Sequence, residues 1–479
     1  MNIINNVKQI SEKVKDKIMR VFDKTSLNNL ARKTGFIKRS TVKAEGEDFV
    51  KLMTTEIIGE DAVSTEGLCD ILRQINPEAD MTPQSLNERI NRKESVEYLK
   101  EVFEAAFREN LEPVRSAISP ALLSPFGRVF IEDSTAITLN EKLADEFRGS
   151  GGSASRSAVK IDITYEVKQD IIQNILIKNG NDSDLSEAET ILTGLRENDL
   201  ILRDLGYFTL KSLREISGKR AFFLSRMLKG VNVYLSADKD AEAIDLTEFI
   251  DKKFGFLPVS DINVYIGKEE RLPCRLIAYR LPDDTVAERI RKARGNTQKK
   301  GRQLTEEYLN WLRFNIFITN ISCEILEAES VGTVYRLRWQ IEITFKHWKS
   351  LLKINIMRGI RRERVECFLY GRLTVIVILT MICGYASWYA YNYLKKEASF
   401  HKLINWLKRK GRLSDAVRSG CVEALFEELR EISGTLCKQK RKRKTTRQLL
   451  EERIPYMESF LPDYVENRDS DPILLKKAA

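Results

Sequence analysis

The sequence predicts an α/β fold, in which a mixed sheet is flanked by helices. Short runs rich in Val, Ile, Phe and Tyr fill the middle of the chain, whereas both ends are patterned as helices. The 479 residues are enough for two to four domains with sizeable cores. A hydrophobic content of 43% with 31% charged residues is typical of a folded protein.

The net charge, the cysteines and the histidines limit the classes of function that the chain can have. The formal net charge of +10 indicates an anionic partner. Seven scattered cysteines form no C-x2-C pair, and the only histidines are His347 and His401. This composition argues against most zinc sites and against a disulfide framework, and it favours a reducing cytoplasm. The N-terminus has no apolar run of the kind found in signal peptides.

Residues 1–118 are predicted to be helical. Within them, Thr65–Ile75 and Pro83–Ile90 are amphipathic runs separated by NPEADMT. This pattern is compatible with a helix-turn-helix whose second helix reads a DNA groove. Ordinary packing of two helices is the alternative interpretation.

Four strands and two helices are predicted next. GRVFIEDSTAITL contains a buried strand that ends near Glu132 and Asp133. AVKIDITYEV alternates as a half-buried strand, which places Asp162 on a polar and solvated face, and IIQNILIK follows as a third strand. After a helical run over Leu185–Leu195, DLILRDLGYF forms a short strand that ends at Asp204. A helix over Tyr207–Ser217 then follows.

A β-rich segment follows, over residues 219–310. AFFLSRM, VNVYLS, INVYIG and CRLIAYRL are short strand-like runs with turn signals between them. They lead into a basic run, which comprises Arg289, Arg291, Lys292, Arg294, Lys299, Lys300 and Arg302. We expect this run, and the similar tail KQKRKRKTTR at 438–447, to contact a DNA backbone; a solvated loop is the alternative.

The segment from Val334 to Ser350 mixes buriable and ionisable side chains, and it follows a predicted strand, FNIFITN. On a helix at ~100° per residue, Tyr335, Arg338, Glu342 and Lys349 fall within an arc of roughly 60°. Leu337, Ile341, Phe345 and Trp348 form a second stripe that is suited to packing. An ordinary face of ion pairs is the alternative interpretation of the first stripe.

The segment from Leu373 to Leu394 has no charged residue and is long enough to span a membrane. It contains Gly384, Ser387 and Asn392, and no second segment resembles it. We therefore expect a buried core helix, with a membrane helix as the alternative.

The predicted elements have a ribonuclease H-like order when residues 219–310 are treated as an insertion. The order becomes β-β-β-α-β-α-β-α, with Asp133 and Asp204 at strand ends and Glu342 on the helix after the last strand. Three converging carboxylates suit two Mg²⁺ ions. The predicted regions are a helical DNA-binding region (1–118), a divided catalytic core (119–218 and 311–400), the insertion (219–310) and a helical basic C-terminal region (401–479).

Three motifs resemble those of bacterial insertion-sequence DDE transposases with the YREK signature. They are DST at Asp133, D-x-G-Y-F at Asp204–Phe208, and Y-x2-R-x3-E-x6-K at Tyr335–Lys349. The resemblance implies a catalytic and metal-binding triad of Asp133, Asp204 and Glu342 that uses two Mg²⁺ or Mn²⁺ ions. It also implies phosphate contacts by Tyr335, Arg338 and Lys349.

The resemblance further implies partners and a reaction. The expected partners are double-stranded DNA, as terminal inverted repeats and target DNA, and a second subunit in the active complex. The expected location is the bacterial cytoplasm, at the nucleoid and not in a membrane. The alternatives are a metal-dependent DNA nuclease on the same core and a transposase-derived protein that binds DNA without cleaving it.

The base-stacking aromatic residue departs from the family pattern, and the first carboxylate ligand has an alternative. Hairpin-forming relatives place a tryptophan right before the last strand to stack a flipped base, but here that neighbourhood reads WLRFNIF. Trp311 lies earlier than expected and Phe314 is the other aromatic residue, so Trp311 is either a base-stacking or a core residue. Glu132, directly before Asp133, is the alternative carboxylate ligand if Asp133 is a turn residue.

Overall fold

The computed structural model describes residues 3–38, 44–61, 63–79, 81–152, 154–183, 190–298, 303–439 and 444–460. The chain divides into two compact units. Unit 1 comprises residues 1–118, 133–182 and 342–439, and unit 2 comprises residues 119–132, 183–341 and 440–479. Strand β1 (Val129–Thr138) passes from unit 2 to unit 1 between Glu132 and Asp133.

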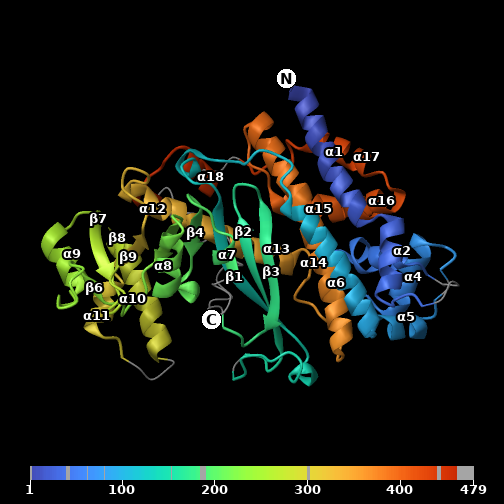
Figure 1. The fold of residues 1–479 in the computed structure, drawn as a ribbon, viewed down its shortest axis with the longest axis horizontal. Coiled ribbons are helices and arrows are strands. Elements are labelled where there is room, and N and C mark those ends of the chain that lie inside the picture. Colours follow the sequence, from blue (N-terminus) through green and yellow to red (C-terminus); the bar gives the residue numbers. More distant parts are fainter. Residues whose placement is uncertain are drawn as a thin grey trace. The chain divides into compact units, whose positions relative to one another are not determined.

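Unit 1 is mainly helical (Figure 1). Strands β2 (Ala158–Glu166) and β3 (Ile171–Asn179) form an antiparallel hairpin in it. Its helices are α1 (Ile3–Val21), α2 (Lys24–Lys33), α3 (Gly46–Met53), α4 (Thr65–Ile75), α5 (Pro83–Ile90), α6 (Lys93–Leu111), α14 (Arg362–Tyr389), α15 (Phe400–Lys408), α16 (Arg412–Ser419) and α17 (Val422–Ile432). On the hairpin, Asp162 is buried against Lys178 at 2.9 Å, so its predicted solvation is wrong.

The predicted helix pair is present with its expected ends. Ser64 caps α4 by accepting a hydrogen bond from Gly67 N, and Thr82 caps α5 by accepting one from Ser85 N. Pro83 occupies the first turn of α5, where its missing N–H costs nothing. A DNA-reading role for this pair stays a prediction.

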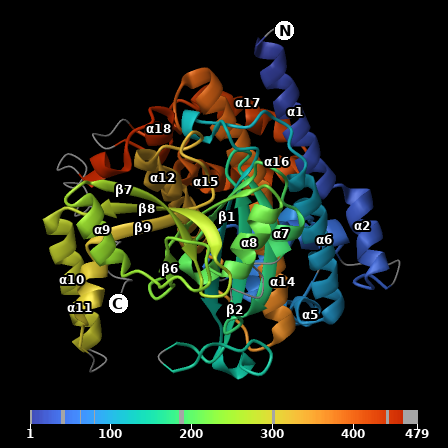
Figure 2. The same ribbon diagram turned by 60° about the vertical axis from the view of Figure 1, so that its left-hand side comes forward.

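Helix α14 is the central helix of unit 1, and it runs beside α6 (Figures 1 and 2). It belongs to the one described helix, Arg362–Leu394, that is long and apolar enough to cross a membrane, but 83% of its apolar window is buried inside the protein. Gly371 allows close approach to α3, because a Cβ there would lie 2.1 Å from Met53 O. This burial supports the expected core helix.

Unit 2 is built on a mixed sheet. Strand β1 pairs in parallel with β4 (Leu200–Arg203), and β4 pairs in parallel with β5 (Phe222–Arg226). The remaining strands, β6 (Val233–Tyr234), β7 (Val259–Ile266), β8 (Leu272–Arg280) and β9 (Phe314–Thr319), extend the sheet with antiparallel pairs. The nine strands of the described chain have the order β3-β2-β1-β4-β5-β9-β8-β7-β6. The predicted α/β class with a mixed sheet is therefore confirmed.

One strand differs from the sequence interpretation. Phe314–Thr319 was expected to be the core strand that follows the strand ending at Asp204, with 219–310 as a separate insertion. Instead, β5 lies next to β4 in parallel, with Leu202 opposite Leu224. Strand β9 pairs with β5 antiparallel. The reason is that α8 (Leu210–Gly218) returns the chain directly to the edge of β4, as a short right-handed crossover requires.

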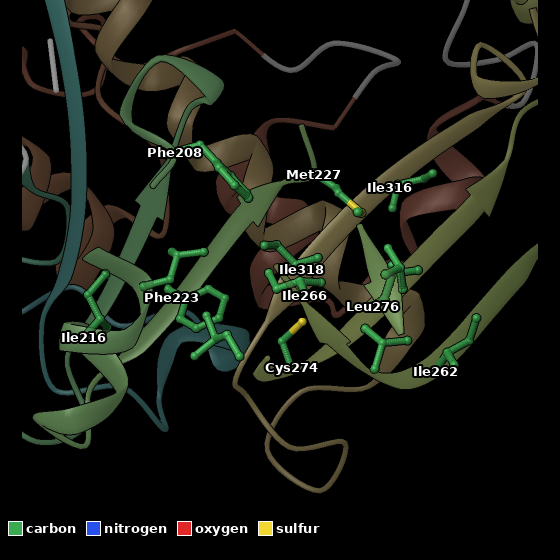
Figure 3. Close-up of a cluster of buried hydrophobic side chains, with 14 of the residues drawn as sticks. Phe208, Ile216, Phe223, Met227, Ile262, Ile266, Cys274, Leu276, Ile316 and Ile318 are labelled. Carbon is green, nitrogen blue, oxygen red and sulfur yellow. The ribbon is translucent and has the colours of Figure 1, made fainter. Parts of the chain in front are cut away.

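Unit 2 also contains helices α7 (Thr190–Thr193), α8, α9 (Leu246–Phe254), α10 (Asp283–Gln298), α11 (Glu306–Trp311), α12 (Ala328–Tyr335) and α18 (Thr446–Glu451). Its core is a continuous apolar cluster (Figure 3). The cluster joins residues of β4 and β5, such as Ile201 and Phe223, to residues of β7–β9, such as Ile262, Leu276 and Ile318. A single core therefore holds the strand that ends at Asp204 and the β-rich segment together.

Candidate active site

Asp204 lies directly after β4, whose four residues are all buried. Its side chain is 39% exposed, and the chain turns immediately after it through the 3₁₀ turn η4 (Leu205–Tyr207), with Tyr207 N donating to Asp204 O at 3.0 Å. The predicted strand end and turn are thus confirmed. The carboxylate is held at the end of a rigid strand and remains accessible.

A buried ion pair lies next to this carboxylate. Arg203 is fully buried, and its guanidinium lies 3.2 Å from the buried Glu132 carboxylate on β1. Arg203 also donates to Tyr207 O at 3.1 Å and to Ser212 Oγ at 2.8 Å. Since Glu132 precedes Asp133 and Arg203 precedes Asp204, this pair fixes the residue before each predicted catalytic aspartate. The ion pair also disfavours Glu132 as the metal ligand.

Asp133 is half-buried on β1, where side chains alternate between the two faces of the strand. It therefore faces away from the side to which Glu132 turns. Ser134 N donates to Asp133 Oδ1 at 2.8 Å, which orients the carboxylate. These features suit a ligand role for Asp133 better than for Glu132.

The signature segment is not one uniform α-helix. Helix α12 ends at Tyr335, the 3₁₀ turn η5 covers Arg336–Arg338, and α13 covers Trp339–Ser350. A 3₁₀ turn advances by about 120° per residue, so the single stripe expected at 100° does not run unchanged across η5. Within α13, Glu342 and Lys349 are seven residues apart and share one side, and both are half-buried.

Tyr335 and Arg338 contact the end of β4. Tyr335 is 8% exposed, and its hydroxyl donates to Arg203 O at 3.1 Å. Burial raises the pKa of Tyr335 well above its usual range. Its hydroxyl satisfies a buried carbonyl, and the phosphate contact expected for Tyr335 stays a prediction. Arg338 Nε lies 3.7 Å from Asp204 Oδ1, so this cation sits beside the predicted catalytic carboxylate.

The packing stripe of the signature segment is confirmed. Leu337, Ile341, Phe345 and Trp348 are all buried, and the rings of Phe345 and Trp348 meet edge to face with their centroids 5.5 Å apart. In the part of the chain that the structure describes, no group of three or more His, Cys, Asp or Glu side chains is arranged to hold a metal ion. The carboxylate oxygens of the predicted triad are nevertheless the hard donors that Mg²⁺ prefers.

The basic run is largely helical rather than a loop, because α10 extends to Gln298. Arg289 donates to Asn315 Oδ1 at 2.6 Å and to Phe314 O at 3.3 Å, so it anchors α10 to β9 instead of facing a ligand. Arg291, Lys292 and Arg294 are exposed. Lys299, Lys300 and Arg302 lie outside the described residues, as do residues 440–443 of the basic tail.

The two aromatic residues considered for base stacking differ in burial. Phe314 is 2% exposed and belongs to the core cluster of unit 2. Trp311 is half-buried and packs against the same cluster. The core interpretation therefore fits Phe314, and the packing of Trp311 favours it there too.

A family model described as "Transposase DDE domain" matches residues 124–378. The chain belongs to the DDE transposase family. It is therefore an enzyme that cuts and joins DNA, and the matched region includes Asp133, Asp204 and Glu342. The resemblance expected from the three motifs is confirmed.

Relatives of this transposase come from bacterial insertion sequences. The transposase for insertion sequence element IS231C of Bacillus thuringiensis subsp. berliner is 31% identical, with 82% of this chain and 84% of the relative covered. The transposase for IS1151 of Clostridium perfringens is also 31% identical, with 78% and 80% covered. A solved piggyBac transposase synaptic complex with hairpin DNA aligns at a TM-score of 0.41 and 11% identity, over 87% of this chain and 82% of that chain, which is too remote to support an argument.

The exposed part of α10 gives a first testable prediction for this transposase. Replacing Arg291 and Arg294 by Gln should lower the magnitude of the log K versus log[salt] slope for DNA binding by about two, because each phosphate contact contributes about 0.9. Arg289→Gln is the matched control and should leave the slope unchanged, since Arg289 is bound to Asn315. If Arg289→Gln lowered the slope as much per substitution as the double variant does, this assignment would be contradicted.

Proposed function

We propose that this transposase binds the ends of its own insertion sequence, cleaves them and transfers the strands to target DNA by two-metal phosphoryl transfer. The observation that carries the proposal is the family match across all three predicted carboxylates, Asp133, Asp204 and Glu342. A ribonuclease H-like core is part of the proposal. The strand order β3-β2-β1-β4-β5, with β1, β4 and β5 parallel and β2 and β3 antiparallel, supports it.

In this proposal the triad would hold two Mg²⁺ or Mn²⁺ ions. Bound in this way, the ions supply stabilisation of the attacking and leaving oxygens of the phosphate. Water, and then a DNA 3′-hydroxyl, would be the nucleophiles. Arg338 would bind a phosphate oxygen near the cut, since guanidinium groups bind phosphates through paired donors. Its distance of 3.7 Å from Asp204 supports this role.

The remaining parts of the proposal concern partners and location. The α4–α5 helix pair would recognise the terminal inverted repeats, and two subunits would assemble on paired ends. The enzyme would act in the bacterial cytoplasm at the nucleoid. The burial of α14 argues only against a membrane-spanning role for that helix.

The proposal is tested with purified protein, Mg²⁺, a DNA fragment that contains the coding region with its flanks, and a target plasmid. We expect cuts at both element ends and joined products in the plasmid, and EDTA should abolish both. Cleavage without joining would favour the nuclease alternative. Binding without cleavage would favour a transposase-derived DNA-binding protein.

Arg338 and Lys349 provide a further prediction. Arg338→Ala and Lys349→Ala should each weaken the paired-end complex about ten- to a hundredfold, because a charge-assisted contact contributes roughly 1.5–3 kcal/mol. Lys349→Arg should be tolerated better than Arg338→Lys, because lysine does not reproduce a bidentate contact. Gel shifts on element ends measure this, with thermal melts as the folding control. If both alanine variants bind and cleave normally while folded, the stripe is an ordinary ion-pair face.

A further inference from the structure

The start of α14 carries an arginine-rich segment that the sequence interpretation did not use. Residues 358–364 read RGIRRER, which is four arginines against one glutamate. Arg358, Arg361 and Arg362 are exposed, and Arg361 is the N-cap residue of α14. A helix N-terminus normally favours negative side chains, so this concentration of cations is not explained by helix stability.

A second group of cations lies at the junction of α5 and α6 in the same unit. Arg89 is half-buried near the end of α5, Arg92 is the exposed N-cap residue of α6, and Lys93 is the first residue of α6. The helices that carry the two groups contact each other. Arg364 on α14 donates to Asn87 Oδ1 on α5 at 3.1 Å. Cys367 Sγ also lies 3.3 Å from Ile90 O, so the two helices pack against each other here.

The half-buried arginines of these groups differ from Arg362 in their partners. Within the described ranges, neither Arg89 nor Arg364 forms an ion pair with a carboxylate, whereas Arg362 is paired with Glu366 at 2.9 Å. The guanidinium of Arg89 lies over the Phe36 ring at 5.1 Å, and that of Arg364 lies over Phe368 at 5.4 Å.

The surroundings of both arginines disfavour their charged form. Burial lowers the pKa of Arg89, and the nearby Arg92 lowers it further. Burial also lowers the pKa of Arg364. Removing a cation from water without an anion costs free energy, and an external anion would offset that cost.

We propose that the arginines of residues 358–364, together with Arg89, Arg92 and Lys93, form a surface that binds the sugar–phosphate backbone of duplex DNA. The inference rests on the proposed function and adds a binding surface to it. Arginine matches phosphate geometry, and backbone contacts set the register of a protein on DNA without reading sequence. Because the surface includes the end of α5, it would fix how the predicted helix pair meets its duplex.

The test measures salt dependence of binding by the full-length protein. The variant is Arg361→Gln with Arg364→Gln, and the probes are two duplexes of roughly three helical turns. One duplex carries an element end and the other has an unrelated sequence. We expect the slope magnitude to fall by about two on both duplexes, at about 0.9 for each lost phosphate contact.

The control is Lys8→Gln with Lys13→Gln on α1, which removes the same charge from exposed positions. It should leave the slope unchanged. An unchanged slope in the arginine variant, or an equal fall in the control, would overturn the proposal. If the double variant melts early, the single Arg361→Gln variant decides, because the exposed Arg361 makes no side-chain capping bond, and it should lower the slope by about one.

Two further outcomes distinguish this DNA-binding surface from a subunit interface and from the proposed function. Loss of subunit pairing with an unchanged salt slope would assign the surface to a second copy of the chain and overturn the proposal. Cleavage of element ends by the wild-type protein tests the proposed function independently. Normal cleavage with an unaffected slope would therefore refute the surface alone.

Discussion

Asp204→Asn should reduce cleavage of element ends by at least about a thousandfold and leave DNA binding largely intact. Losing a metal-ligating carboxylate forfeits several kcal/mol of charge stabilisation in the transition state, at about 1.36 kcal/mol for each factor of ten. Asp204 is 39% exposed, and its contact with Arg338 is long at 3.7 Å, so its loss should not unfold unit 2. Binding should be unchanged or tighter, because the substitution removes a negative charge from a protein that binds a polyanion.

The measurement is a time course of strand cleavage with Mg²⁺ beside a gel shift on the same ends. Asp133→Asn and Glu342→Gln should behave in the same way. Asp240→Asn is the control, since Asp240 is exposed and lies outside the three motifs. Near-normal cleavage by Asp204→Asn would remove Asp204 from the catalytic triad.

The order of elements and the strand end at Asp204 could be predicted from the sequence, because both depend on local signals. LILRDLGYF combines a short apolar run with a Gly turn, and the structure ends β4 and begins η4 within it. The ends of α4 and α5 follow from Ser64, Thr82 and Pro83 in the same way. Helix caps and turns depend on residues that are neighbours in the sequence, so a single sequence is enough to predict them.

Strand pairing and side-chain partners could not be predicted in the same way. Nothing in AFFLSRM distinguishes a strand that pairs with β4 from one in a separate insertion, since the pairing depends on contacts distant in sequence. Arg289 has the same charge as its exposed neighbours, and its hydrogen bond to Asn315 on β9 distinguishes it from them. Tyr335 was assigned by its motif, but its partner is a main-chain carbonyl that no side-chain pattern indicates.

The ion pair between Glu132 and Arg203 could not be predicted from the sequence. A charged residue at the end of an apolar run normally marks where a strand reaches solvent, and each of these residues fits that pattern. They lie 71 positions apart in the sequence, and only the parallel pairing of β1 with β4 brings them together. The pair supports the two strand ends from the buried side.

Glu132→Gln should lower the free energy of unfolding by about 3 kcal/mol, because it removes the negative charge that lies 3.2 Å from the fully buried guanidinium of Arg203. Urea unfolding compared with the wild type measures this loss. Asp133→Asn is the matched neighbour and should abolish cleavage with a much smaller loss of stability, since Asp133 is half-buried on the alternate face of β1. Glu132 would then be assigned to the stability of the fold, and Asp133 to the cleavage reaction.

A double substitution tests the same ion pair. Replacing both Glu132 and Arg203 by Met should recover part of the stability that Glu132→Gln loses, because an apolar pair carries no uncompensated charge. Cleavage by this double variant should remain below wild type, since Arg203 also donates to Tyr207 O and Ser212 Oγ and so holds the turn after Asp204. If Glu132→Gln instead unfolds like the wild type but no longer cleaves with Mg²⁺, Glu132 is the metal ligand and Asp133 is not.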